Sequence, residues 1–149
     1  MLNASNIQKE AFKVIMVHLK VHHIGYLVKK INAAVTEFER LGYTIQQDIV
    51  YDDYRKINIC FMEKDGYLVE LVSPTDSDSV VAGLLKKYKN CPYHLCYESF
   101  DFENDLSTLA QNGYTAIDMP TPAPALSGKR VAFLMNASLG MIELLEINP

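Results

Sequence analysis

The chain lacks a long hydrophobic run, and none of its apolar stretches approaches the roughly 20 residues of a membrane-spanning helix. The stretch 12–17 is short, is interrupted by Lys13 and precedes no small-residue cleavage site, so a secretory signal is not expected. A basic excess is also missing, because 14 Lys and Arg stand against 18 Asp and Glu and leave a net charge of -4. We therefore expect a cytoplasmic protein that binds neither a membrane nor nucleic acid.

Cysteines are few, and their placement gives no sign of a disulfide framework or a zinc site. The three residues Cys60, Cys91 and Cys96 cannot all pair within one chain, and their spacing is not C-x-x-C. Reduced thiols are the expectation. A length of 149 residues, with 49% hydrophobic and 21% charged residues, is ordinary for one globular domain that spans 1–149.

What the chain does contain is an internal repeat. His23 and His94 each begin a strand-like segment, and a Gly-Tyr-Thr segment starts 19 residues after each of them. Glu70 follows His23 by 47 residues, and Glu143 follows His94 by 49 residues. Because these landmarks recur in the same order at nearly the same spacing, we interpret the chain as two copies of one structural unit.

Each copy reads as strand, helix and three further strands. Residues 31–41 carry apolar side chains at helical spacing, and Gly42 stands where a helix C-cap glycine belongs. The predicted helices are 31–41 and 102–111, and the predicted strands are 20–28, 43–50, 55–63, 66–73, 92–99, 114–118, 129–135 and 140–147. The fold prediction is an α+β domain of two tandem βαβββ modules, 20–75 and 92–149, whose curved mixed sheets surround a metal-binding cleft. A connector helix lies within 76–91, and 1–19 is an N-terminal extension.

Two glutamates interrupt apolar strands. Leu68 and Val72 flank Glu70 on its own face of the strand, and the opposite face is apolar as well. Glu143 lies in the same setting, within GMIELLE. A buried carboxylate costs several kcal/mol unless it has a partner. An edge strand with a wet glutamate is the alternative, but the repeated position favours burial.

His23 and His94 offer the partner that these acids need. A single strand histidine is usually structural, but here two recur beside two equivalent glutamates. Two imidazoles and two carboxylates suit a divalent ion of Zn, Ni, Co, Mn or Fe, whose charge the carboxylates balance. His22 and His18 have no counterpart in the second half, and we interpret them as structural or exposed.

These residues resemble the vicinal oxygen chelate superfamily of glyoxalase and bleomycin-resistance proteins. The resemblance covers about residues 20–147, and it is carried by VHHIGYLV, LVELVSP, PYHLCYES and GMIELLE. It implies metal ligands at His23, Glu70, His94 and Glu143. The connector after ELVSP and the segment GKRVAFL are similar to methylmalonyl-CoA epimerase-like members, and the ligand set is similar to that of glyoxalase I-like members. Where the epimerase pattern places an acid in a strand, this sequence has RKIN, which begins at Arg55.

The resemblance implies an isomerase, epimerase or lyase that transfers a proton next to a carbonyl, with Glu143 as the base and Glu70 sharing that role. A small-molecule substrate, such as an acyl-CoA or a 2-oxo compound, and a homodimer are expected. Lys129 and Arg130 precede the penultimate strand and are candidates to bind a phosphate or carboxylate at the cleft rim, although SGKR is not a Walker A loop. Two alternatives stay open: an iron-dependent dioxygenase, and a metal-free small-molecule binding or resistance protein.

Overall fold

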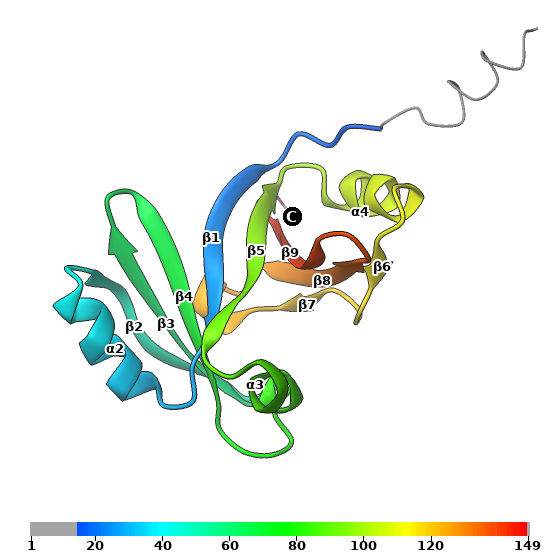
Figure 1. Cartoon of the computed structure of the whole chain (residues 1–149). Helices are drawn as coiled ribbons and strands as arrows, with labels where there is room; N and C mark the ends of the chain where they lie inside the picture. Colours follow the sequence, from blue (N-terminus) through cyan, green and yellow to red (C-terminus); the bar gives the residue numbers. More distant parts are fainter. Residues whose placement is uncertain (1–14, 149) are drawn as a thin grey trace, which may run out of the picture.

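The structure is a computed structural model that describes residues 15–148 (Figure 1). Its first half contains β1 (Lys20–Leu27), α2 (Ile31–Arg40), β2 (Thr44–Asp52), β3 (Ile57–Lys64) and β4 (Tyr67–Pro74). Helix α3 (Ala82–Tyr88) connects the halves. The second half contains β5 (Cys91–Ser99), α4 (Phe102–Gln111), β6 (Thr115–Ala116), β7 (Thr121–Pro122), a 3-10 turn η1 (Pro124–Leu126), β8 (Arg130–Asn136) and β9 (Gly140–Glu146).

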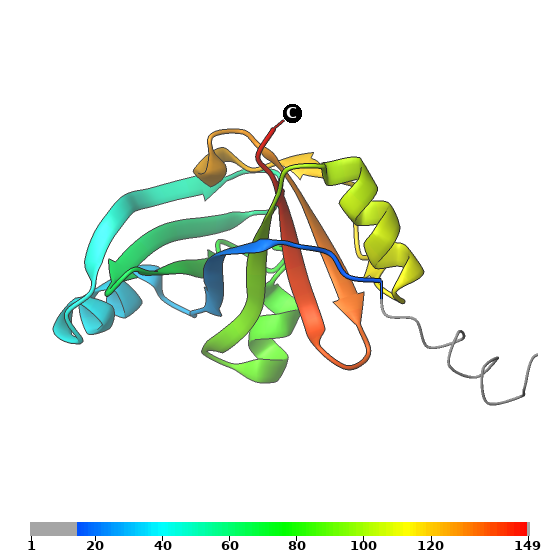
Figure 2. The same cartoon turned by 90° about the horizontal axis from the view of Figure 1, so that it is seen from above.

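All the strands belong to one mixed sheet, in the order β2-β3-β4-β1-β5-β9-β8-β6, with β7 paired to β8. β1 runs parallel to β4, β5 runs parallel to β9, and β1 and β5 join the two halves as an antiparallel pair. The two halves of the sheet curve around a concave face, and α2 and α4 lie on the outside (Figures 1 and 2). The predicted α+β class with a curved mixed sheet is confirmed.

The outer face of the sheet is covered by the predicted helices. Ile31 of α2 is buried, and Phe38 packs with it against β3 and β4. Leu41, predicted as part of this apolar face, ends the helix as its C-cap and is 64% exposed. Gly42 follows with φ 93° and Gly113 with φ 91°, so the C-cap prediction is confirmed at Gly42 and the same geometry recurs after α4.

The strand that begins at Ile57 is shorter than the predicted 55–63, and its start has a local cause. The Asp52 carboxylate accepts a hydrogen bond of 3.0 Å from the backbone N–H of Arg55, which closes a turn. Lys56 then adopts φ 54°, outside the extended region. The turn therefore removes 53–56 from the sheet and places Arg55 at the edge of the concave face.

The short strand β7 and the turn η1 were not predicted, and the other differences are at element ends. β6 is limited to 115–116 instead of the predicted 114–118, and the helical part of the connector is 82–88 within the predicted 76–91. Most of the predicted N-terminal extension lies outside the described residues, and 15–19 form no helix or strand. The division into an extension, two modules and a connector stays a prediction.

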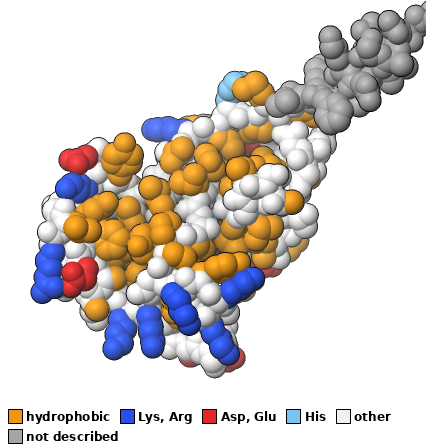
Figure 3. All heavy atoms as spheres, viewed as in Figure 1, with side chains coloured by type: hydrophobic (Ala, Val, Ile, Leu, Met, Phe, Trp, Pro, Cys, Tyr) orange, Lys and Arg blue, Asp and Glu red, His pale blue; other side chains and the backbone are white. Residues whose placement is uncertain are grey.

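Among residues 15–148, no helix is both long and apolar enough to cross a membrane. Cys60, Cys91 and Cys96 are free thiols, as expected. Hydrophobic side chains gather across the middle of the face seen in Figure 1, with Lys and Arg along its lower edge (Figure 3). Exposed apolar residues include Val21 in β1 and Leu95 in β5. The predicted homodimer stays a prediction.

Candidate metal centre

Four side chains meet at the centre of the concave face. They come from the four adjacent strands β4, β1, β5 and β9, which contribute Glu70, His23, His94 and Glu143 in that order. Each residue is at most 5% exposed. One ligand atom from each lies within 4.8 Å of all the others. The sheet order explains the meeting, since the first and last strands of each half are neighbours.

The distances in this cluster fit a central ion. His23 Nε2 lies 3.2 Å from His94 Nε2, and Glu143 Oε1 lies 3.1 and 3.3 Å from these two nitrogens. Glu70 is slightly farther, at 3.5 Å from His23 Nε2 and 3.8 Å from His94 Nε2. Ligands about 2.1 Å from a divalent ion are separated from one another by roughly 3.0–3.4 Å. Among the described residues, Glu143 Oε1 is also buried without a hydrogen-bond partner. The donor set therefore fits a divalent metal.

The histidines and glutamates of the cluster shift the pKa values of one another. Burial alone lowers the pKa of His23, but Glu70 and Glu143 outweigh it and raise the pKa to about 10. Burial alone would raise the pKa of Glu143, yet the close contacts and charges of His23 and His94 lower it below its ordinary value. Without a metal, His23 thus keeps a proton at neutral pH, and its positive charge offsets part of the negative charge of the two carboxylates.

A β-bulge precedes each of the two histidines. His22 is the extra residue between the pairs Val21–Tyr97 and His23–Cys96, and Tyr93 is the extra residue opposite the Gly25–Tyr26 step. A bulge re-aims side chains, so the residue before each histidine lies beside it on the concave face. The ring of His22 is 5.0 Å from that of His23, and the ring of Tyr93 is 4.4 Å from that of His94. His22 therefore has a structural counterpart, Tyr93, contrary to the sequence interpretation.

His22 holds His23 in the orientation that the cluster needs. The two Nδ1 atoms lie 2.8 Å apart, so one of them carries the shared hydrogen. Because His23 directs Nε2 to the cluster, its Nδ1 donates to His22 when Nε2 is free to bind a metal. A sequence signal for this role exists, since the His-His doublet at one repeat position matches Tyr-His at the other.

Gly25 is required for the position of His94. The two residues are paired across β1 and β5, and a Cβ on residue 25 would lie 2.5 Å from His94 Nε2. Any side chain there would displace the imidazole from the cluster. His94 Nδ1 has no hydrogen-bond partner among the described residues. On the Nδ1 side, packing in place of a hydrogen bond thus holds the His94 ring.

The two basic residues predicted for substrate binding have different positions. Lys129 borders a cavity next to the cluster, together with His22. Arg130 instead donates hydrogen bonds of 2.7 and 2.9 Å to Glu146 and one of 3.0 Å to Glu103. The structure brings Lys129 to the concave face but not the Arg130 guanidinium.

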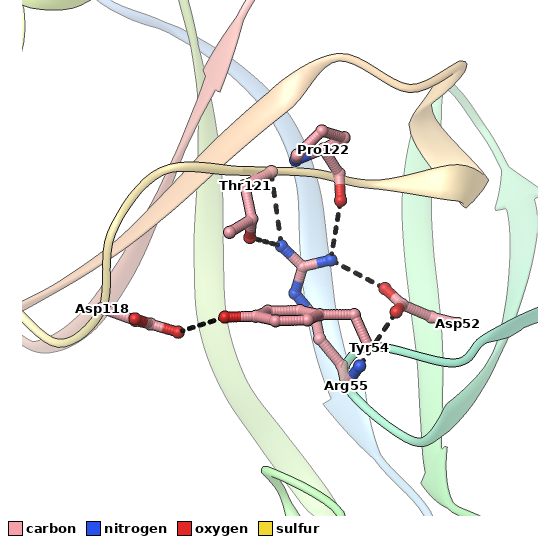
Figure 4. A network of polar contacts seen from close by, with 6 residues as sticks. All are labelled: Asp52, Tyr54, Arg55, Asp118, Thr121 and Pro122. Carbon is pink, nitrogen blue, oxygen red and sulfur yellow. Dashed lines mark hydrogen bonds and ion pairs between the residues drawn. The ribbon is translucent and has the colours of Figure 1, made fainter.

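A second polar network lies at the edge of this face, and the sequence did not predict it (Figure 4). The Arg55 guanidinium donates 2.7 Å to the Asp52 carboxylate, 3.0 Å to the Pro122 carbonyl, and also to the Thr121 hydroxyl. The side chains of Asp52 and Arg55 are 1% and 9% exposed. The pair holds the segment of β7 against the first half of the sheet. An Asp-x-x-Arg spacing after a strand was the available signal.

A family model described as the Glyoxalase/Bleomycin resistance protein/Dioxygenase superfamily matches residues 22–133. The chain belongs to this superfamily. The match confirms the resemblance inferred from the His and Glu segments. No curated protein matches the chain.

Solved structures of this superfamily share the fold. Methylmalonyl-CoA epimerase from Mycobacterium tuberculosis superposes with a TM-score of 0.77 at 20% identity, over 94% of this chain and 96% of that chain. A hypothetical protein from Bacillus halodurans C-125 gives 0.77 at 23% identity, over 89% and 97%. Streptomyces coelicolor methylmalonyl-CoA epimerase in complex with 2-nitronate-propionyl-CoA gives 0.72 at 20% identity, over 85% and 93%. At these identities the likeness establishes the fold and not the reaction.

Proposed function

We propose that this glyoxalase-superfamily protein is a divalent-metal-dependent enzyme, an isomerase, epimerase or lyase that moves a proton next to a carbonyl. The observation that carries the proposal is the buried cluster of two imidazoles and two carboxylates. Such a set, at these distances, suits Zn, Ni, Co, Mn or Fe. When bound there, the ion would supply Lewis acidity that makes the proton beside a carbonyl easier to remove.

The carboxylates of the cluster would handle the proton. Glu143 is the proposed base, because its Oε1 faces the cluster, is buried and accepts no hydrogen bond among the described residues. Its lowered pKa keeps it ionised at neutral pH, so the carboxylate carries no proton before the substrate binds. Glu70 lies across the cluster and would take or return a proton at the other face of the substrate. Phe61 packs against the ring of His23, and Phe133 packs against the ring of His94.

The substrate is proposed to be a small acyl-CoA or 2-oxo compound whose oxygens reach this cluster. Support comes from Lys129 beside the concave face, which would bind an anionic group of the substrate. Arg130 contributes less to this proposal, since Glu146 and Glu103 occupy its guanidinium. A homodimer is proposed as well, and its test is the molar mass in solution by light scattering.

The test of the reaction is hydrogen exchange in D₂O. The Co²⁺-loaded protein is incubated with 2-methylmalonyl-CoA and with 2-oxo acids, and deuterium at the carbon beside the carbonyl is followed by mass spectrometry. We expect exchange, and a rate at least about 100-fold lower for Glu143→Gln. Glu39→Gln, which changes an exposed acid on α2, should leave the rate unchanged. Absence of exchange in every substrate, together with oxygen consumption, would favour a dioxygenase and overturn the proposal.

A further inference from the structure

Three cavities lie along the concave face, with the metal centre at the middle one. The central cavity, about 20 Å³, is bordered by Glu70 and Glu143. On one side of it lies a cavity of about 340 Å³, with which it shares Ala125 and Leu126 as walls. On the other side lies a cavity of about 230 Å³, with which it shares Arg55, Ile57, Tyr93 and Phe133. The three cavities are therefore neighbours in one cleft.

The two outer cavities are related by the internal repeat. His22 borders the larger one and its counterpart Tyr93 borders the smaller one. Phe61 likewise borders the larger cavity and Phe133 the smaller one. Phe61 pairs with Glu70 of β4, and Phe133 pairs with Glu143 of β9. Further matched wall residues are Leu68 with Met141, Gln46 with Ile117, and Gln47 with Asp118. The repeat thus places one cavity on each side of the metal centre.

Equivalent in position, the two cavities differ in chemistry. The larger, here called the polar cavity, is bordered by His22, Gln46, Gln47, Ser127 and Lys129. The smaller, here called the apolar cavity, is bordered by Val80, Val81, Leu84, Ile117 and Met141.

The charged groups at the edge of the apolar cavity already have partners. Arg55 pairs with Asp52 at 2.7 Å, and Asp118 accepts a hydrogen bond of 3.3 Å from the Tyr54 hydroxyl (Figure 4). Neither of them therefore needs a polar ligand, and the remaining wall gains free energy only when apolar surface covers it.

From this contrast we infer that the substrate has an apolar substituent longer than a methyl group, which the apolar cavity binds, while its polar remainder lies in the polar cavity. The inference rests on the proposed function, because it requires substrate oxygens at the metal centre between the two. The central cavity has room for about one water molecule, so its walls have to open when those oxygens enter. The apolar cavity, in contrast, has its space before the substrate arrives.

The experiment measures the affinity of the Co²⁺-loaded protein for unbranched 2-oxo acids that grow from pyruvate to 2-oxooctanoate. Calorimetry gives the Kd, and the visible spectrum of Co²⁺ reports whether each acid reaches the metal. We expect the Kd to fall about fourfold per added CH₂ until the cavity is filled. Ile117→Asp should reduce this gain to less than about twofold, because it places a charge in the apolar wall.

Leu139→Asp is the control, since Leu139 is an exposed apolar residue like Ile117 but borders none of the three cavities. It should leave the dependence on chain length intact. If all the 2-oxo acids bind to the metal and their Kd does not depend on chain length, this inference is overturned and the proposed function stays in place. If no acid perturbs the Co²⁺ spectrum, the inference fails together with the 2-oxo compound as substrate, and proton exchange in 2-methylmalonyl-CoA then decides the proposed reaction separately.

Discussion

Replacement of Gly25 by alanine should damage the metal centre without a change in any cluster residue. The new Cβ would lie 2.5 Å from His94 Nε2, whereas ordinary Cβ contacts begin at 3.4 Å. The imidazole or the β1 backbone must therefore move by about 1 Å, which exceeds the tolerance of roughly 0.2 Å in metal–ligand distances. Because one of the four ligands is lost or strained, the Kd for Co²⁺ should rise at least about 100-fold in Gly25→Ala.

Calorimetric titration of the metal-free protein measures this change, and Gly83→Ala provides the control. Gly83 has no neighbour within 4 Å of an added Cβ, and its φ is not positive. The control should bind Co²⁺ like the parent protein. An unchanged Kd in Gly25→Ala, with the fold intact by circular dichroism, would refute the close approach of His94 to β1.

Three further predictions concern the surroundings of the cluster. His22→Phe removes the nitrogen that orients His23 and should weaken Co²⁺ binding by about 10- to 100-fold, as measured by chelator competition. His22→Gln should restore the binding, and His18→Phe, which changes an exposed histidine, should have no effect. Since the pKa of metal-free His23 is raised to about 10, a proton must leave when the metal binds. The Kd should therefore fall about tenfold per pH unit between about pH 6.5 and 8.5, and a flat profile would contradict this. Arg55→Met leaves the buried carboxylate of Asp52 without its partner and should lower the free energy of unfolding in urea by about 3 kcal/mol. A decrease of less than about 1 kcal/mol would mean that the pair is not buried.

Most of the fold could be predicted because the internal repeat limits how the helices and strands can be arranged. The helix 102–111 and the strands that carry His23, Glu70, His94 and Glu143 follow from apolar periodicity. That these four side chains would be near one another followed from their repeated positions and from the need of buried carboxylates for a partner. Their distances required the pairing of β1 with both β4 and β5, which no local pattern specifies.

What the sequence could not provide depends on small departures from regular strands. The bulges at His22 and Tyr93 interrupt the alternation of side chains along β1 and β5. A prediction that assumes regular strands therefore places both residues on the wrong face of the sheet. The Asp52–Arg55 turn delays the start of β3 to Ile57, whereas the apolar spacing predicted that the strand begins at residue 55. Arg130 shows the same limit, because Glu103 and Glu146 approach it only in the folded chain.

The metal centre is proposed to hold one divalent ion between the two imidazoles and the two carboxylates. A crystal structure of the Co²⁺-loaded protein, with the ion located by its anomalous scattering, tests this proposal. We expect one cobalt per chain, bonded to Nε2 of His23 and His94 and to oxygens of Glu70 and Glu143. Cobalt bound elsewhere, or a cluster that stays metal-free at saturating Co²⁺, would contradict it.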